Sequence, residues 1–231
     1  MTVERSAGAS YGLFEQAQES AAYEGLRDLI LSRRIAAGDP LEIASLSDDL
    51  DVEPHQLQAA IARLSAEFLV SRDDGGAFLA APVTTEVATG LFDARTVIEI
   101  GVVDGFALTM TDDELEELAR LAHELAVIVA EPMPDLGRFL ETSHEYHLHL
   151  VGAAHSEPLT AAYLKLGISR LWRSSIADLD WWNLFDVRHH GDLTNALRDR
   201  DVTRAKQLVY EHQEQVKGLV RDVISRGDGA L

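Results

Sequence analysis

The sequence contains no cysteine, and no apolar run approaches the roughly 20 residues that a membrane-spanning helix needs. The first absence excludes disulfides, thiol nucleophiles and metal sites built on thiolates. No charged segment followed by an apolar one marks the N-terminus as a secretory signal. These absences predict a cytoplasmic protein with no membrane partner.

Positive charge is also scarce. The chain carries 20 Lys and Arg against 39 Asp and Glu, a formal net charge of −19. Such a balance disfavours polyanionic partners and favours solubility. The 231 residues, 46% of them hydrophobic, suffice for a small module and one larger domain with its own core. Residues 1–20, rich in Ala, Ser, Gly and Glu, are expected to form a flexible tail.

Residues 21–82 have the pattern of a winged helix-turn-helix domain. Apolar residues repeat at helical spacing in three short segments, and a break at 51–54 separates the second from the third. Pro54 suits the first turn of a helix, which predicts a third helix from Pro54 to about Phe68. The letters FLVSR and AFLAA on either side of the turn at 73–76 then predict a two-stranded hairpin, the wing.

This domain resembles the GntR family of bacterial transcription regulators over about sixty residues. The resemblance is carried by LRDLILSRRIAAGDPL (26–41), LSDDLDV (46–52), PHQLQAAIARLSAEFLV (54–70) and GGAFLAAPVT (75–84). It implies a homodimer that binds a DNA operator with two half-sites. The third helix would then read base edges.

The predicted DNA-reading positions depart from the family pattern. Family members usually have Ser, Arg, Thr and Pro at the start of the third helix and a second Arg soon after. Here these positions hold Glu53, Pro54, His55, Gln56 and, for the second Arg, Gln58. The wing has acidic residues, at 73 and 74, where a basic residue is common.

Charge in this domain makes DNA binding doubtful. Residues 21–80 contain five Arg and no Lys against eleven Asp and Glu, a net charge of −6, whereas DNA-binding modules neutralise phosphates with clustered basic side chains. Glu53 at the helix start would repel a phosphate there. The remaining candidate DNA-binding residues are His55, Gln56, Gln58, Arg63 and Arg72.

Residues 86–228 have the sequence pattern of long helices joined by short loops. Apolar periodicity and capping signals predict helices at 87–109, 111–130, 136–154, 158–176, 182–199 and 202–225. Such helices form an antiparallel bundle whose interior can take a ligand. The whole chain is therefore expected to be mainly α, with a winged helix-turn-helix followed by an all-α domain.

Histidines are concentrated in this second domain. Seven of the nine lie between His144 and His212. Helical bundles build metal sites from one imidazole on each of several helices, and imidazole suits Zn, Ni, Cu or Fe. Scattered histidines are more often surface or hydrogen-bonded core residues, so their spacing alone does not establish a metal site.

The second domain resembles the FadR C-terminal domain (FCD) that follows the winged helix in one GntR subfamily. The matching segments are FDARTVIEIGVVDGFA (92–107), FLETSHEYHLHLVGAAHSEPL (139–159) and HHGDLTNALRDRDVTRAKQLVYEHQEQV (189–216). In many members an Asp, a His four residues later and two His on the last helices bind a divalent metal. The resemblance implies that His147, His190 and His212 bind Zn, Ni or Fe.

The expected aspartate position holds Ser143 instead. A neutral hydroxyl is a poor ligand, so a bound metal would keep more open positions, as in a catalytic site. Glu141, His144 or Glu145 would substitute if the helix register shifts.

Arg95 lies where an arginine often meets the effector's carboxylate in this family, and a guanidinium binds carboxylates bidentately. The alternative is an intrahelical pair with Glu99, four residues on. The resemblance thus implies a small carboxylate as the effector.

Two functional classes remain open. The first is a transcription regulator in which a small carboxylate, with a metal, shifts the winged helices of a dimer. The second is a repurposed protein that has lost DNA binding and uses the three-histidine pocket as a metalloenzyme or metabolite-binding site. In that case Glu141 or Glu145 would be the candidate base.

Overall fold

The computed structural model describes residues 20–32, 34–82, 84–166 and 186–226. These residues divide into two compact units, one before residue 84 and one from Thr84 onward. The division falls between the domain limits expected from the sequence, 82 and 86. The predicted flexible tail lies outside the described residues except for Ser20, which is already helical.

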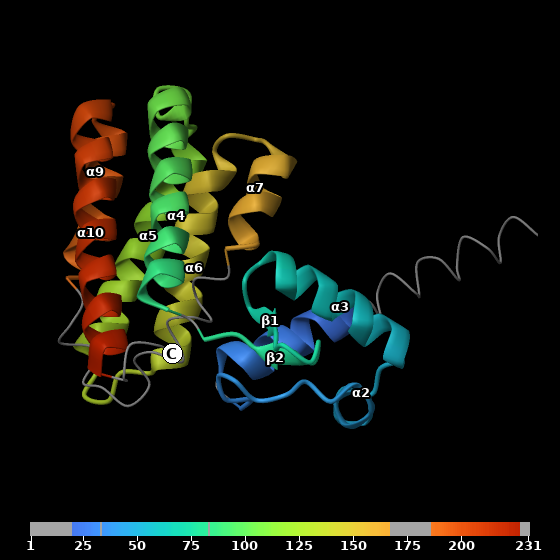
Figure 1. Cartoon of the computed structure of the whole chain (residues 1–231). Helices are drawn as coiled ribbons and strands as arrows, with labels where there is room; N and C mark the ends of the chain where they lie inside the picture. Colours follow the sequence, from blue (N-terminus) through green and yellow to red (C-terminus); the bar gives the residue numbers. More distant parts are fainter. Residues whose placement is uncertain (1–19, 33, 83, 167–185, 227–231) are drawn as a thin grey trace, which may run out of the picture. The chain divides into compact units, whose positions relative to one another are not determined.

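The first unit is a winged helix-turn-helix, as predicted. A helix over residues 20–31 is followed by α2 (Ile43–Leu50), α3 (Pro54–Ala66), β1 (Val70–Arg72) and β2 (Phe78–Ala80) (Figure 1). The two strands pair antiparallel, with Ser71 opposite Leu79. Gly76 provides the left-handed conformation (φ +84°) that the wing's turn requires.

Apolar side chains from three helices form the core of this unit. Leu26 of the first helix and Leu57, Ile61 and Leu64 of α3 are completely buried, and Leu46 of α2 is also buried. Burying each such side chain contributes about 1.5–3 kcal/mol relative to leaving it exposed. The third helix thus has one face committed to the core and only the opposite face available for a partner.

The second unit is an all-helical bundle, again as predicted. Its described helices are α4 (Thr85–Phe106), α5 (Asp112–Ala130), α6 (Leu136–Gly152), α7 (Glu157–Leu164), α9 (Arg188–Arg198) and α10 (Val202–Arg226) (Figure 1). Helix α10 packs against α4 and α9, α5 packs against α6 and α9, and α6 contacts α4 and α7. The fully buried Phe92, Leu118, Leu125, Tyr146 and Leu150 lie in its core.

Helices α4, α5, α6 and α7 begin with side-chain caps. Thr84 accepts a hydrogen bond from the backbone N of Val87 at 3.3 Å at the start of α4. The predicted capping box before α5 is present, since Glu114 N donates to Thr111 Oγ1 (3.3 Å) and Thr111 N donates to Glu114 Oε2 (2.7 Å). Capping therefore stabilises the starts of α5 and of α4, the helix that carries Arg95 and Glu99.

Two helix limits differ from the sequence prediction by more than three residues. Helix α7 ends at Leu164 rather than continuing to Ile176, and the described residues after it form a turn. Helix α9 begins at Arg188 rather than Trp182, and the carboxylate of Asp186 accepts from the backbone N of Arg188 at 3.1 Å. The predicted helical residues 167–176 and 182–185 lie outside the described residues.

Candidate metal centre and candidate DNA-reading helix

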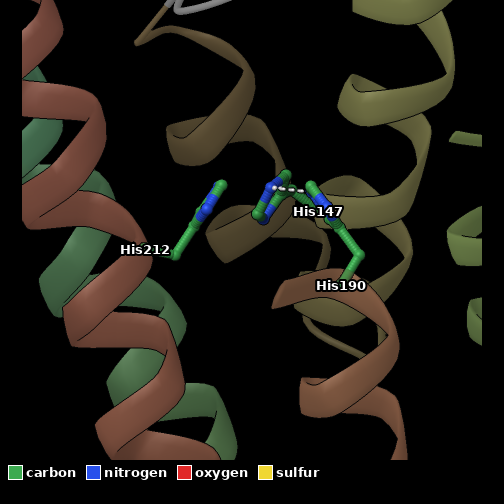
Figure 2. A group of neighbouring side chains, drawn as sticks. All are labelled: His147, His190 and His212. Atoms are coloured by element: carbon green, nitrogen blue, oxygen red, sulfur yellow. Dashed lines mark hydrogen bonds between the residues drawn. The ribbon is translucent and has the colours of Figure 1, made fainter. Parts of the chain in front are cut away.

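Three histidine side chains from three helices meet inside the bundle (Figure 2). His147 comes from α6, His190 from α9 and His212 from α10. The Nε2 atoms of His147 and His190 lie 3.3 Å apart, and one ring nitrogen of each histidine lies within 4.8 Å of the others. Nitrogens bound to one zinc ion at about 2.0–2.1 Å are separated by roughly 3–4 Å, so small side-chain rotations suffice for all three to bind.

Contacts of Tyr146 fix the position of α6 relative to α9. The Tyr146 hydroxyl lies 2.9 Å from the backbone oxygen of His190 and 2.9 Å from Thr194 Oγ1. The ring of Tyr146 also meets the His190 ring edge to face, with centroids 4.8 Å apart. Because Tyr146 precedes His147 in the chain, the same contact that joins α6 to α9 brings the two imidazoles together.

The site also contains a carboxylate that the sequence interpretation treated only as a partner of Arg95. Glu99 on α4 is completely buried. Its Oε1 accepts from Arg95 Nε at 2.8 Å and from the Tyr163 hydroxyl at 2.8 Å, and its Oε2 accepts from Gln213 Nε2 at 3.0 Å. The same Oε1 lies 3.1 Å from Nδ1 of His147. The predicted alternative for Arg95, an ion pair with Glu99, is thus present.

Burial and neighbouring charges favour neutral histidines. Burial lowers the pKa of His147, and the positive charge of Arg95 lowers it further against the opposing effect of Glu99. Burial and the neighbouring imidazoles hold the pKa of His190 and of His212 well below its usual value. Neutral imidazoles have the lone pair that a metal ion requires.

Glu99 is ionised in the same environment. Burial alone would raise its pKa, but His147 and Arg95 together lower the pKa below its usual value. Buried charges persist only when they are paired and hydrogen-bonded, and the carboxylate of Glu99 meets both conditions.

The donor set fits a transition metal. Nδ1 of each of the three histidines, His147, His190 and His212, is buried and has no hydrogen-bond partner among the described residues. A cavity of about 20 Å³ adjoins His190 and His212, and both Ser143 and Arg95 line it. Three soft-to-borderline nitrogen ligands beside a small open space match a site of the three-histidine type.

The other predicted site residues of α6 differ in their distance from the cluster. Ser143 lines the cavity beside His190 and His212, whereas His144 does not belong to the group of described residues whose ligand atoms converge. Glu141 and Glu145 are exposed, in contrast to the buried His147. The register of α6 therefore directs His147, and neither glutamate, to the histidine cluster.

The exposed face of α3 differs from the predicted DNA-binding set at one position. Gln56 is only 1% exposed, and its side-chain oxygen accepts from the backbone N of Glu53 at 3.0 Å. It belongs to the N-terminal cap of the helix, which corrects its prediction as a base-reading residue. His55 and Gln58 are exposed.

The two predicted DNA-binding arginines are exposed but stack on aromatic rings of the same unit. The guanidinium of Arg63 lies 3.7 Å from the centre of the Tyr23 ring, and that of Arg72 lies 4.1 Å from the centre of the Phe78 ring. Tyr23 in turn donates to Glu67 at 2.7 Å. Arg63 thus shares its surroundings with a carboxylate, which weakens its attraction for a phosphate.

Family models account for both units. The model of bacterial regulatory proteins of the gntR family matches residues 18–79, and the FCD domain model matches residues 90–215, more than half of the chain. The chain belongs to the GntR family. It is an FCD-type GntR transcription regulator, with the fold that the sequence predicted.

Solved structures of GntR regulators have the same fold. McbR/YncC of E. coli is 16% identical, with a TM-score of 0.68 over 89% of this chain and 97% of that one. A putative GntR transcriptional regulator from Rhodococcus sp. RHA1 is 21% identical, with a TM-score of 0.65 over 88% and 97%. Lar of Listeria monocytogenes, which controls expression of the agr system, is 15% identical, with a TM-score of 0.57 over 88% and 96%.

No curated protein matches the sequence. Among the described helices of this GntR regulator, none is long and apolar enough to cross a membrane.

Proposed function

We propose that this GntR regulator is a ligand-responsive DNA-binding protein whose helical domain holds a divalent transition metal (Zn, Ni or Fe) on His147, His190 and His212. The observation that supports this most strongly is the convergence of three imidazoles from α6, α9 and α10, with ligand nitrogens within 4.8 Å of one another. The lowered pKa values of these histidines favour the neutral form that binds metals.

The effector that suits this site is a small carboxylate. Three neutral imidazoles leave both positive charges of a divalent ion uncompensated, because Ser143 stands where the family pattern has an aspartate. The adjoining cavity of about 20 Å³ has room for roughly one water-sized group, and Arg95 lines it. One carboxylate oxygen on the metal would fill that space, which favours a short carboxylate.

The regulatory assembly would be a cytoplasmic homodimer on a two-half-site operator. His55 and Gln58 are the exposed candidates for base contacts on α3, and Arg63 and Arg72 are the exposed basic candidates. Effector binding changes the operator affinity only if the two winged-helix arrangements bind the effector with different affinities.

Fluorescence anisotropy with labelled upstream DNA and random duplex DNA tests this function. Zn-loaded and chelator-treated samples are compared at low and rising salt, with and without acetate, and acetamide serves as the neutral control. We expect binding to the upstream duplex that weakens with salt and changes on metal removal. Absence of binding to either duplex at low salt would contradict DNA-binding regulation.

A second function is supported by the charges of the first unit. Arg27 lies 3.7 Å from Glu67, Arg63 stacks on Tyr23, and the domain carries a net negative charge. In this alternative the winged helix no longer binds DNA, and the histidine centre binds or transforms a metabolite. Stoichiometric metal without DNA binding would select it. Unchanged metabolite binding or turnover in a variant with all three histidines replaced by alanine would exclude it.

A further inference from the structure

Glu99 connects four helices at the histidine centre. It lies on α4, and its hydrogen-bond donors come from α4 itself (Arg95), α7 (Tyr163) and α10 (Gln213). Its fourth neighbour is His147 on α6, with 3.1 Å between Oε1 and Nδ1. An i, i+4 ion pair needs only the contact between Arg95 and Glu99. The contacts of Glu99 with α6, α7 and α10 go beyond such a pair.

The hydrogen bonds to Glu99 leave it poorly suited to bind a metal directly. Oε1 already accepts from Arg95 and Tyr163, and Oε2 accepts from Gln213. The positive charge of Arg95 balances the negative charge of the carboxylate. Glu99 therefore adds no net charge to the histidine centre, and its influence on a metal passes through His147.

The two nitrogens of the His147 ring face different partners. Nδ1 lies 3.1 Å from Oε1 of Glu99, a close approach whose angles do not yet form a hydrogen bond, and it has no other hydrogen-bond partner among the described residues. Nε2 lies 3.3 Å from Nε2 of His190 (Figure 2). In a neutral imidazole one nitrogen carries the proton and the other carries the lone pair. A proton on Nδ1 is stabilised by the carboxylate, and the lone pair then lies on Nε2, among the other imidazoles.

We propose that Glu99 is a positioning residue that fixes His147 in the Nδ1–H tautomer and orients its Nε2 toward the metal. This is the carboxylate–histidine–metal arrangement, in which the carboxylate also raises the basicity of the ligand. The metal part of the inference rests on the proposed function. The tautomer part concerns the metal-free protein and stands independently.

Through Glu99 and His147, the proposed metal would be linked to helix α4. Arg95 and Glu99 lie on α4, the helix that begins the second unit at Thr85 and follows the wing in the chain. A change in the position of His147 on metal binding would act on α4 through its contact with Glu99. Tyr163 and Gln213 extend the same network to α7 and α10.

Two-bond ¹H–¹⁵N NMR correlation of the metal-free wild-type protein tests the tautomer. The His147 signals are assigned by their loss in a His147→Gln variant. We expect the proton on Nδ1 at neutral pH. A proton on Nε2 would overturn the inference, whether or not the wild-type protein binds metal.

A charge-balanced variant tests the effect on metal binding. Replacing the pair together, as Arg95→Met with Glu99→Met, avoids leaving one buried charge unpaired. We expect its affinity for Zn²⁺ to fall by roughly 10–100-fold, the usual effect of losing such a carboxylate. Arg120→Met with Glu124→Met, the same replacement at an i, i+4 ion pair of α5, is the matched control, and we expect its affinity to stay within a few-fold of wild type.

The outcomes separate the inference from the proposed function. Wild-type affinity in the folded double variant, verified by circular dichroism, would overturn the positioning role. Wild-type protein with the Nδ1–H tautomer but no metal affinity would contradict the metal function alone. If the double variant does not fold, the tautomer measurement on the wild-type protein still decides the inference.

Discussion

Ser143 is the residue at which this chain departs most clearly from the metal pattern that its family resemblance implies. It lines the cavity beside His190 and His212, so a side chain at this position reaches the open side of the centre. A serine hydroxyl adds neither charge nor a strong ligand. The departure leaves the centre more positive and more open than an aspartate would.

Ser143→Asp should therefore tighten metal binding. The added carboxylate supplies an anionic ligand, and we expect the affinity for Zn²⁺ to rise at least about tenfold, equivalent to roughly 1.4 kcal/mol. Competition titration with a chromophoric chelator measures the change. Ser143→Asn, which adds an uncharged oxygen at the same place, is the control, and an equal rise in both variants would show that charge is not the cause.

The buried histidines also predict how stability depends on pH. Their folded-state pKa values lie below those of the unfolded chain. Between the two values the unfolded state binds more protons, so the free energy of unfolding falls as the pH drops below about 6.5, by at most ~1.4 kcal/mol per pH unit for each group. Above that pH both states are neutral and the contribution is complete.

Urea unfolding of the metal-free protein between about pH 7.5 and about pH 5 measures this slope. A variant with His147, His190 and His212 all replaced by glutamine should show a shallower fall. An identical slope in both proteins would mean that these histidines do not titrate as their burial implies. Glu99 does not contribute in this range, because its lowered pKa places its own effect below about pH 4.5.

Residue-level chemistry was only partly predictable from the sequence. The resemblance identified the three histidines, and the structure brings them together. Glu99 was visible only as the i+4 neighbour of Arg95. Its contacts with Tyr163 and Gln213 span 64 and 114 residues of sequence, and no local pattern encodes contacts of that range.

At the scale of single elements, α3 shows how one helix divides its polar residues between folding and function. Gln56 and Gln58 are two residues apart and therefore lie on different faces. Gln56 is buried at the N-terminal cap, whereas Gln58 is exposed. The sequence indicated two equivalent glutamines, because cap geometry depends on where the helix begins relative to the core.

Alanine substitution of the two glutamines should have different effects on stability. Gln56→Ala removes a capping hydrogen bond from a buried position, and we expect a loss of about 1 kcal/mol in the free energy of unfolding. Gln58→Ala should change stability by less than about 0.5 kcal/mol, as is usual for surface positions. Urea unfolding measures both. Equal stability losses would contradict the assigned division of roles.

Helix limits in the bundle were less predictable than helix identity. The apolar periodicity of the sequence did not indicate the early end of α7 at Leu164 or the late start of α9 at Arg188. Arg200 illustrates the same point after α9. It adopts a left-handed conformation (φ 56°) while its guanidinium donates to the backbone oxygens of Ala107 and Met110 at 2.7 and 2.8 Å. Helical periodicity in the sequence does not indicate such a long-range contact.

At the scale of the whole molecule, the order of the two domains was the most predictable property. Apolar periodicity, the wing's turn and the capping signals sufficed for a winged helix-turn-helix followed by a helical bundle, and both family models agree. The net charge of −19 follows directly from the composition, and it has a physical consequence for DNA binding. Long-range repulsion from DNA must be overcome by local contacts, so any operator binding should be weak at physiological salt.

The central proposal is that the helical domain holds a metal ion on His147, His190 and His212. Zn²⁺ titration of chelator-treated protein tests it directly, with wild type compared with the His147→Ala, His190→Ala, His212→Ala triple variant. His123→Ala, which removes an exposed histidine of α5, is the control. We predict one high-affinity ion per chain in wild type and in the control, and its loss in the triple variant. Equal binding by the triple variant and wild type would contradict the claim.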